Sequence, residues 1–166
     1  MGKSSALNCL AGRHRLARVS KTPGRTDALY FYRVNDDHYW VDFPGYGYAR
    51  RSHEIRMQWR EIAEYYLAYR VQLRGVIFLV DARHAPTHGD QQMMDWLMQY
   101  PRPLLLVMTK GDRVPAGERR AREQAVRTWA TTYDAVEGII WFSSKTREGR
   151  PAVLAWIRKK CQEVHR

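Results

Sequence analysis

Residues 103–112 read PLLLVMTKGD, an apolar run that ends abruptly in a threonine, a lysine, a glycine and an aspartate. A short run of this kind is typical of a strand that is buried on both faces of a parallel sheet. Similar runs occur at 75–82 (GVIFLVDA) and 138–144 (GIIWFSS), and a helical pattern follows each of the three. Buried strands that alternate with helices predict an α/β fold, with a mostly parallel sheet and helices on both of its faces.

The rest of the chain completes this pattern. A first helix is expected at 3–12, because Gly12 is a typical helix-stop residue. The segments 28–34 and 38–43, separated by Asn-Asp-Asp, predict a hairpin of two strands. The other helices are expected from 53 to about 73, after a cap at Thr87, from about 116 to 132, and up to about 165.

The helix that begins at 53 is expected to bury one face. Its members are spaced three and four residues apart: Ile55, Trp59, Ile62, Tyr66 and Tyr69. Because no linker, internal repeat or low-complexity tract interrupts the sequence, we expect a single domain over residues 1–166.

The composition is that of a globular protein with a strong basic excess. The chain has 28 Lys and Arg residues against 17 Asp and Glu residues, a formal net charge of +11. Such an excess favours polyanions such as RNA, and the alternative is a solvated basic surface. Cys9 and Cys161 lack metal-ligand spacing, and the apolar runs are far shorter than the roughly 20 residues of a membrane-spanning helix. We expect a cytoplasmic monomer without a membrane span.

Ligands of parallel α/β sheets bind at the carboxyl ends of the strands. Short polar motifs stand at these positions: DFPG (42–45), DARH (81–84), TKGD (109–112) and SSK (143–145). Taken singly, each is also compatible with a capped turn at the end of a strand. The TKGD and SSK motifs are the most informative, because together they contain the groups that recognise one nucleotide base.

The TKGD motif points to guanine. The Asp112 carboxylate can accept hydrogen bonds from the ring N1–H and the exocyclic amine of guanine, whereas adenine offers no such donor pair on that edge. The aliphatic stem of Lys110 would cover the base, and the amide of Ser144 would face guanine O6. The motif therefore predicts selection of GTP over ATP.

Residues 1–5, MGKSS, match the end of the phosphate-binding pattern G-x-x-x-x-G-K-[ST]. In that pattern the helix amides and Lys3 bind the phosphates, and the Ser4 hydroxyl is a ligand of Mg²⁺. As a D-x-x-G element, DFPG would bring Asp42 near the magnesium ion through a water and the Gly45 amide to the γ-phosphate. Because GKSS, DFPG, TKGD and SSK occur in the required order, each at a strand end or a helix start, they predict a GTP site.

Longer segments carry a narrower resemblance. SKTPGRT (20–26), DFPGYGYA (42–49), DARHAPT (81–87), TKGD and FSS (142–144) are similar to segments of the EngB (YihA/YsxC) family of bacterial GTP-binding proteins, and the similarity runs through nearly the whole chain. The resemblance implies the P-loop fold of small G proteins, with Ser4 and Thr26 as ligands of Mg²⁺. No residue is assigned as catalytic. The nucleotide-binding residues that it implies are Gly2, Lys3, Ser4, Ser5, Gly24, Arg25, Thr26, Asp42, Phe43, Pro44, Gly45, Thr109, Lys110, Asp112, Phe142, Ser143 and Ser144.

The chain departs from the family pattern in two places. The family has a first strand and the front of the phosphate loop before the Gly-Lys-Ser, so the chain corresponds to a member truncated at its N-terminus within that loop, with the first strand missing. We therefore expect residues 1–166 by themselves to be unstable and to bind GTP weakly. The second departure is Gly111, where the family usually has alanine.

The resemblance also implies a role. Tyr46 stands where many small GTPases have the glutamine that orients the attacking water, which implies slow hydrolysis and use as a switch. In the family the output is assembly of the large ribosomal subunit, with an effect on cell division and septation. Basic residues that fit an rRNA partner are Arg13, Arg15, Arg18, Lys21 and Arg25. The alternatives are a basic RNA-binding module that does not use nucleotide and a cell-division factor that acts through protein contacts.

Overall fold

The structure, a computed structural model, describes residues 2–12, 29–43 and 53–163, with the backbone only at residues 53–56 and 59. The chain divides into two compact units. The larger comprises Met1–Ala17 and Arg74–Arg166, and the smaller comprises Arg18–Leu73. No helix in the described part of the chain is both long enough and apolar enough to cross a membrane.

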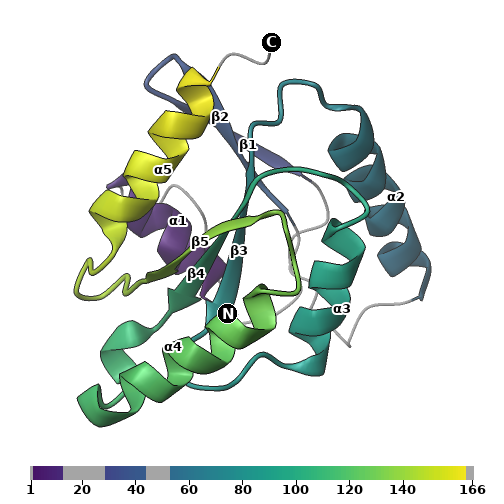
Figure 1. The fold of residues 1–166 in the computed structure, drawn as a ribbon. Coiled ribbons are helices and arrows are strands. Elements are labelled where there is room, and N and C mark those ends of the chain that lie inside the picture. The colour runs from purple at the N-terminus through teal and green to yellow at the C-terminus, as the bar shows by residue number, and fades with distance from the viewer. Residues whose placement is uncertain (1, 13–28, 44–52, 164–166) are drawn as a thin grey trace. The chain divides into compact units, whose positions relative to one another are not determined.

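The larger unit is built around a parallel sheet, as the sequence predicts (Figure 1). The three strands of this sheet lie in the order β3–β4–β5. In chain order, the elements of the unit are α1 (Lys3–Ala11), β3 (Val76–Asp81), α3 (His88–Leu97), β4 (Leu104–Thr109), the 3-10 helix η1 (Gly111–Arg113), α4 (Ala116–Ala130), β5 (Val136–Trp141) and α5 (Arg150–Gln162).

Helices cover both faces of this sheet, which confirms the predicted fold class. The helices α1 and α5 contact each other on one side of the sheet, whereas α3 and α4 lie on the other side (Figure 1). The central strand β4 is buried along its whole length. Apolar side chains such as Leu106 and Met108 are completely enclosed, so the core of this unit lies between its two helical layers.

The register of the sheet brings the ends of the strands together. Asp81, the last residue of β3, lies opposite Thr109, the last residue of β4. Met108 lies opposite Trp141, the last residue of β5. The motifs DARH, TKGD and SSK therefore leave the sheet at the same edge, as expected for parallel strands.

Local signals mark the end of α1 and the start of α3 where the sequence predicts. Thr87 and Asp90 form a capping box at the start of α3, because the Thr87 amide donates to the Asp90 carboxylate at 2.8 Å and the Asp90 amide donates to the Thr87 hydroxyl at 3.2 Å. Gly12 ends α1 with a left-handed backbone, φ 66°. Gly149, the residue before α5, also has a left-handed backbone, with φ 74°.

The smaller unit contains the predicted hairpin. Its strands β1 (Tyr30–Val34) and β2 (His38–Asp42) are antiparallel, with Tyr30 opposite Asp42. The turn between them holds Asn35 and Asp36 at φ values of 51° and 60°. Asn and Asp tolerate this left-handed region better than most residues, which explains why the Asn-Asp-Asp segment forms the turn.

The helix of this unit, α2 (His53–Tyr69), differs from the prediction in its end and in its buried face. It stops at Tyr69 rather than near residue 73. Ile62 and Tyr69, which were expected to be buried, are 48% and 71% exposed, whereas Ala63 and Leu67 are buried. The buried stripe of the helix is thus shifted by about one residue from the stripe of large side chains. A small residue such as Ala63 can pack closely against its neighbours, and single large apolar residues are common on protein surfaces.

Aromatic contacts connect α2 to the hairpin within the smaller unit. The ring of Tyr66 packs edge-to-face on Phe31, with ring centroids 5.9 Å apart, and on Phe43, with centroids 5.5 Å apart. Tyr66, which the sequence places on the buried face of this helix, is half-buried and packs against the hairpin.

Candidate nucleotide-binding site

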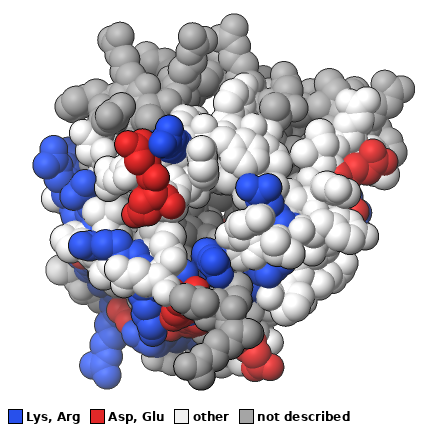
Figure 2. All heavy atoms as spheres, turned by 90° about the horizontal axis from the view of Figure 1, so that it is seen from above, with Lys and Arg blue, Asp and Glu red and all other residues white. Residues whose placement is uncertain are grey.

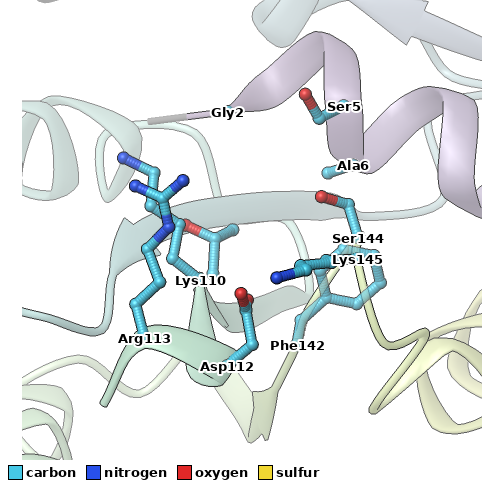
Figure 3. A pocket seen from close by; sticks show the side chains of 10 residues that line it. Gly2, Ser5, Ala6, Lys110, Asp112, Arg113, Phe142, Ser144 and Lys145 are labelled. Carbon is cyan, nitrogen blue, oxygen red and sulfur yellow. The ribbon is translucent and has the colours of Figure 1, made fainter.

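A pocket of about 160 Å³ opens at the carboxyl ends of β4 and β5 in the larger unit (Figure 3). One wall comes from the start of α1. The other walls come from the segments that follow β4 and β5. The lining residues are, by segment, Gly2, Ser5 and Ala6, then Thr109, Lys110, Asp112 and Arg113, then Phe142, Ser144 and Lys145.

Thr109 attaches the end of β4 to β3. Its buried hydroxyl donates a 2.9 Å hydrogen bond to the carbonyl of Val80. Its own carbonyl accepts a 2.9 Å bond from the amide of Ala82. These two bonds fix the start of the TKGD segment against the end of β3. The side chains that follow Thr109 are thereby positioned at the pocket.

The chain turns sharply after Thr109. Lys110 has a left-handed backbone, φ 61°, and the buried Gly111 donates its amide to the carbonyl of Phe142 at 3.0 Å. A Cβ atom at Gly111 would lie 3.2 Å from Cε3 of Trp141. Glycine at this position, where the resemblance leads one to expect alanine, therefore leaves room for the large side chain of Trp141.

Asp112 and Ser143 form the most specific contact of the site. The Ser143 hydroxyl donates a 2.7 Å hydrogen bond to Oδ1 of Asp112. Ser143 is completely buried, and its oxygen accepts hydrogen bonds from the amides of Lys145 and Thr146 at 3.2 and 3.1 Å. Figure 3 shows the Asp112 carboxylate pointing into the pocket. An acceptor group is thus held in a fixed direction beside the apolar ring of Phe142.

Lys110 makes the second polar contact. Its ammonium nitrogen lies 2.7 Å from Oδ2 of Asp81, and the guanidinium of Arg83 binds both oxygens of the same carboxylate at 2.9 and 2.7 Å. Burial by itself would raise the pKa of Asp81, but the hydrogen bonds from Arg83 and Lys110 outweigh it and hold that pKa well below its usual range. Asp81 is therefore a carboxylate at neutral pH.

The start of α1 forms the opposite wall. Gly2 precedes the helix with a left-handed backbone, φ 85°, and the side chains of Ser5 and Ala6 line the pocket. Lys3 and Ser4 occupy the first turn of α1 and are half-buried, but they are not among the residues that line this pocket. The amides of a helix start carry partial positive charge, which suits an anionic ligand.

The structure brings together only part of the predicted set. Gly2, Ser5, Thr109, Lys110, Asp112, Phe142 and Ser144 line one pocket, and Ser143 supports it from below. Asp42 and Phe43 lie at the end of β2 in the smaller unit. The other predicted residues lie outside the described part of the chain: Gly24, Arg25, Thr26, Pro44 and Gly45.

Sequence reasoning assigned no role to several residues of this site. Arg113 and Lys145 add positive charge to the pocket lining, and Asp81, which is itself bound by Arg83, binds the ammonium of Lys110. Asp81 and Arg83 carried a signal, because they belong to the DARH motif at the end of a predicted strand. Lys145 carried a signal as well, as the last residue of the SSK motif, whereas Arg113 stands next to Asp112 without a pattern of its own.

The comparison with family models identifies the broad class. Residues 1–110 match the model described as 50S ribosome-binding GTPase. This match covers more than half of the chain, including α1 and the TKGD threonine and lysine.

Curated relatives give a narrower assignment. The chain is 46% identical over 157 residues to the "Probable GTP-binding protein EngB" of Lactiplantibacillus plantarum, an alignment that covers 95% of this chain and 79% of that protein. It is 45% identical over 149 residues to the protein of the same name from Streptococcus mutans, covering 90% of this chain and 75% of that protein. The corresponding protein of Geobacter sp. is 43% identical over 157 residues, covering 95% of this chain and 72% of that one.

Solved structures agree on the fold. A crystal structure of a probable GTP-binding protein engB has a TM-score of 0.74 at 16% identity, covering 98% of this chain and 94% of that chain. The crystal structure of Era in complex with MgGDPNP and nucleotides of 16S ribosomal RNA has a TM-score of 0.76 at 19% identity, covering 99% of this chain and 54% of that chain. With the fold of P-loop GTPases, the TKGD pocket and relatives at this level of identity, the chain belongs to the EngB family of GTP-binding proteins.

Proposed function

We propose that this protein is a molecular switch that binds GTP and GDP and hydrolyses GTP slowly with Mg²⁺. The observation that carries the proposal is the Asp112–Ser143 contact. A carboxylate whose direction is set by a buried hydroxyl can accept two hydrogen bonds from the N1–H and exocyclic amine of guanine. Adenine has a ring acceptor where guanine has N1–H, so the same carboxylate disfavours ATP.

The remaining contacts of the base follow from the pocket walls. The stem of Lys110 would cover the purine, Thr109 supports the loop, and the amide of Ser144 would donate to guanine O6. The phosphates would extend toward the start of α1, where Gly2, Lys3 and Ser5 stand. We also propose, from the resemblance, that these residues bind the phosphate part of the nucleotide: Gly24, Arg25, Asp42, Phe43, Pro44 and Gly45.

Ser4 and Thr26 are the proposed protein ligands of magnesium. The described residues contain no group of three His, Cys, Asp or Glu side chains that could hold a metal ion. Mg²⁺ commonly takes only one or two protein ligands in nucleotide sites, where phosphates and waters supply the others. The half-buried Ser4, in the first turn of α1, suits that arrangement. When bound, the ion neutralises phosphate charge, while Lys3 and the helix amides orient the phosphates.

We further propose that the switch acts in assembly of the large ribosomal subunit in the cytoplasm, as a monomer, and that cell division and septation depend on it. The family description as 50S ribosome-binding GTPase supports a ribosomal partner. The net charge of +11 suits rRNA. Figure 2 shows Lys and Arg side chains spread over the face drawn there, with acidic side chains among them, so this face does not carry a uniformly basic patch.

The basic charge also favours a second candidate function, a basic RNA-binding module that keeps the fold but does not use nucleotide. The two candidates differ in ligand. Calorimetric titration with GDP, GTP and ATP in the presence of Mg²⁺ tests the first on a chain with the front of the phosphate loop restored: guanine nucleotides should bind and ATP should not. RNA binding by a chain that ignores all three nucleotides would favour the second, and equal binding of ATP and GTP would contradict the proposed reading of Asp112.

A further inference from the structure

The ammonium of Lys110 is attached to the neighbouring strand. It lies 2.7 Å from Oδ2 of Asp81, and Lys110 is only partly exposed, with 28% of its side chain accessible. Asp81 accepts hydrogen bonds on both oxygens, from the amide, Nε and Nη2 of Arg83 and from Lys110. The carboxylate is therefore held by Arg83, and Lys110 is held by the carboxylate.

This contact belongs to a larger junction between the ends of β3 and β4. The Thr109 hydroxyl binds the Val80 carbonyl, the Ala82 amide binds the Thr109 carbonyl, and the Lys110 ammonium binds the Asp81 carboxylate. The first two bonds fix the backbone where TKGD begins. Only the third acts on the side chain that faces the pocket.

The anchor determines the course of the Lys110 stem. A Cβ at Gly2 would lie 3.9 Å from Cε of Lys110, so the far end of the stem passes close to the start of α1. A free lysine side chain has several rotatable bonds and loses considerable entropy when it is ordered. A lysine held at its ammonium has already lost much of that freedom before any ligand arrives.

We propose that Asp81, held by Arg83, is a positioning residue for purine recognition: it fixes the Lys110 ammonium so that the stem of Lys110 is ordered in advance as the cover of the base. The inference rests on the proposed function, since the ligand is the guanine base of a nucleotide. It makes the DARH motif part of the base-binding apparatus, although neither Asp81 nor Arg83 lines the pocket.

The proposal makes a prediction that a purely structural ion pair does not. Because the base is common to GMP, GDP and GTP, loss of the anchor should weaken all three by the same factor. Because the anchor acts through the ammonium of Lys110, its loss should have no further effect once that ammonium is gone. If the ion pair only stabilised the fold, its removal would lower the melting temperature. It would not weaken GMP, GDP and GTP by one common factor, and its effect would not depend on the ammonium of Lys110.

A double-mutant cycle tests both points, with GMP, GDP and GTP titrated calorimetrically into a chain with the front of the phosphate loop restored. The variants are Asp81→Asn, Lys110→Met, which keeps an apolar stem without the ammonium, and the double variant. We expect Asp81→Asn to raise the Kd of all three nucleotides by roughly tenfold, the size of one charge-assisted hydrogen bond. In the Lys110→Met background the same substitution should change Kd less than about twofold. Asp134→Asn, which changes an exposed carboxylate outside the pocket, is the matched control.

Three results would overturn the inference. Additive losses in the cycle would show that Asp81 does not act through Lys110. Tighter binding by Asp81→Asn would show that Asp81 competes with the nucleotide for the ammonium. An unchanged Kd would show that the anchor has no effect on binding of the base.

Arg83→Lys, which keeps the charge and loses the two-point contact, provides a milder second variant if Asp81→Asn does not fold. It should also raise the Kd. Failure of a chain with the front of the phosphate loop restored, and without any substitution, to bind GDP would instead contradict the proposed function itself, before any variant is compared.

Discussion

The hydroxyl of Ser143 donates a 2.7 Å hydrogen bond to Oδ1 of Asp112, a residue 31 positions earlier in the chain. The bond joins the segment after β5 to the segment after β4. Two backbone amides donate to the same serine oxygen, so its proton is directed at the carboxylate. The direction of Asp112 in the pocket therefore depends on a buried residue that the ligand need not touch.

Replacing Ser143 with alanine should weaken guanine nucleotide binding. Asp112 would lose its fixed direction and would have to be ordered by the ligand, so we expect a rise in the Kd of GDP of roughly tenfold. Calorimetry with GDP measures it. Thr131→Ala, which removes a hydroxyl bonded to a backbone carbonyl at the exposed end of α4, is the control and should leave Kd unchanged. Equal losses in the two variants would contradict the role of Ser143.

Asp112→Asn should shift base preference from guanine to xanthine. The amide offers a donor where the carboxylate offered a second acceptor, and xanthine has a carbonyl where guanine has its exocyclic amine. Competition between GTP and XTP, for the variant and for the unsubstituted protein with the front of the phosphate loop restored in both, measures the change. If the variant prefers GTP as strongly as the unmodified chain does, Asp112 does not read the base.

Thr26→Ala should weaken GTP more than GDP. Thr26 is the proposed magnesium ligand that engages when the γ-phosphate is present, whereas Ser4 is expected to act with either nucleotide. The ratio of the two Kd values, measured with Mg²⁺ in excess, tests this expectation. Ser4→Ala is the matched variant and should weaken both nucleotides similarly. A similar loss for both nucleotides in Thr26→Ala would remove Thr26 from the switch.

Gly149→Ala should strongly destabilise the protein. Gly149 has φ 74°, and a Cβ there would lie 1.9 Å from the carbonyl oxygen of Trp141, so both conformation and space require glycine. We expect a loss of about 2 kcal/mol or more in the free energy of unfolding, measured by chemical denaturation.

Gly117→Ala is the control for this substitution. It lies in α4, and apart from its chain neighbours and the backbone of its own helix, no heavy atom of the described residues comes within 4 Å of its Cβ position. Alanine favours helix over glycine, so this variant should be unchanged or slightly more stable. A Gly149→Ala variant as stable as Gly117→Ala would show that the backbone at the start of α5 can rearrange without cost.

Binding to rRNA or ribosomal particles should fall steeply between about 50 and 200 mM salt, because several phosphates would be neutralised. Charge reversal at Arg15 and Arg18, which lie outside the described residues, should flatten this dependence. Filter binding or sedimentation at a series of salt concentrations measures it. An interaction that does not respond to salt would point to a protein partner instead.

The sequence by itself determined the strands, the helix starts and the edge of the sheet where the site lies. The apolar runs of β3, β4 and β5, the Thr87 cap and the Gly12 stop are local signals, and each acts through its own neighbours in the chain. The rule for parallel strands then placed DARH, TKGD and SSK at one edge, and the register of the sheet agrees.

Only the tertiary structure decided which side chains act together at that edge. The pairs Ser143–Asp112 and Asp81–Lys110 join segments 31 and 29 residues apart, and they exist because β4 lies between β3 and β5, so that the carboxyl ends of the three strands meet. The buried stripe of α2 likewise runs through Ala63 and Leu67 rather than through its larger neighbours. Spacing along the chain shows which residues share one face of a helix or strand. It does not show which face is buried or which distant side chains meet, because both depend on contacts between different segments of the chain.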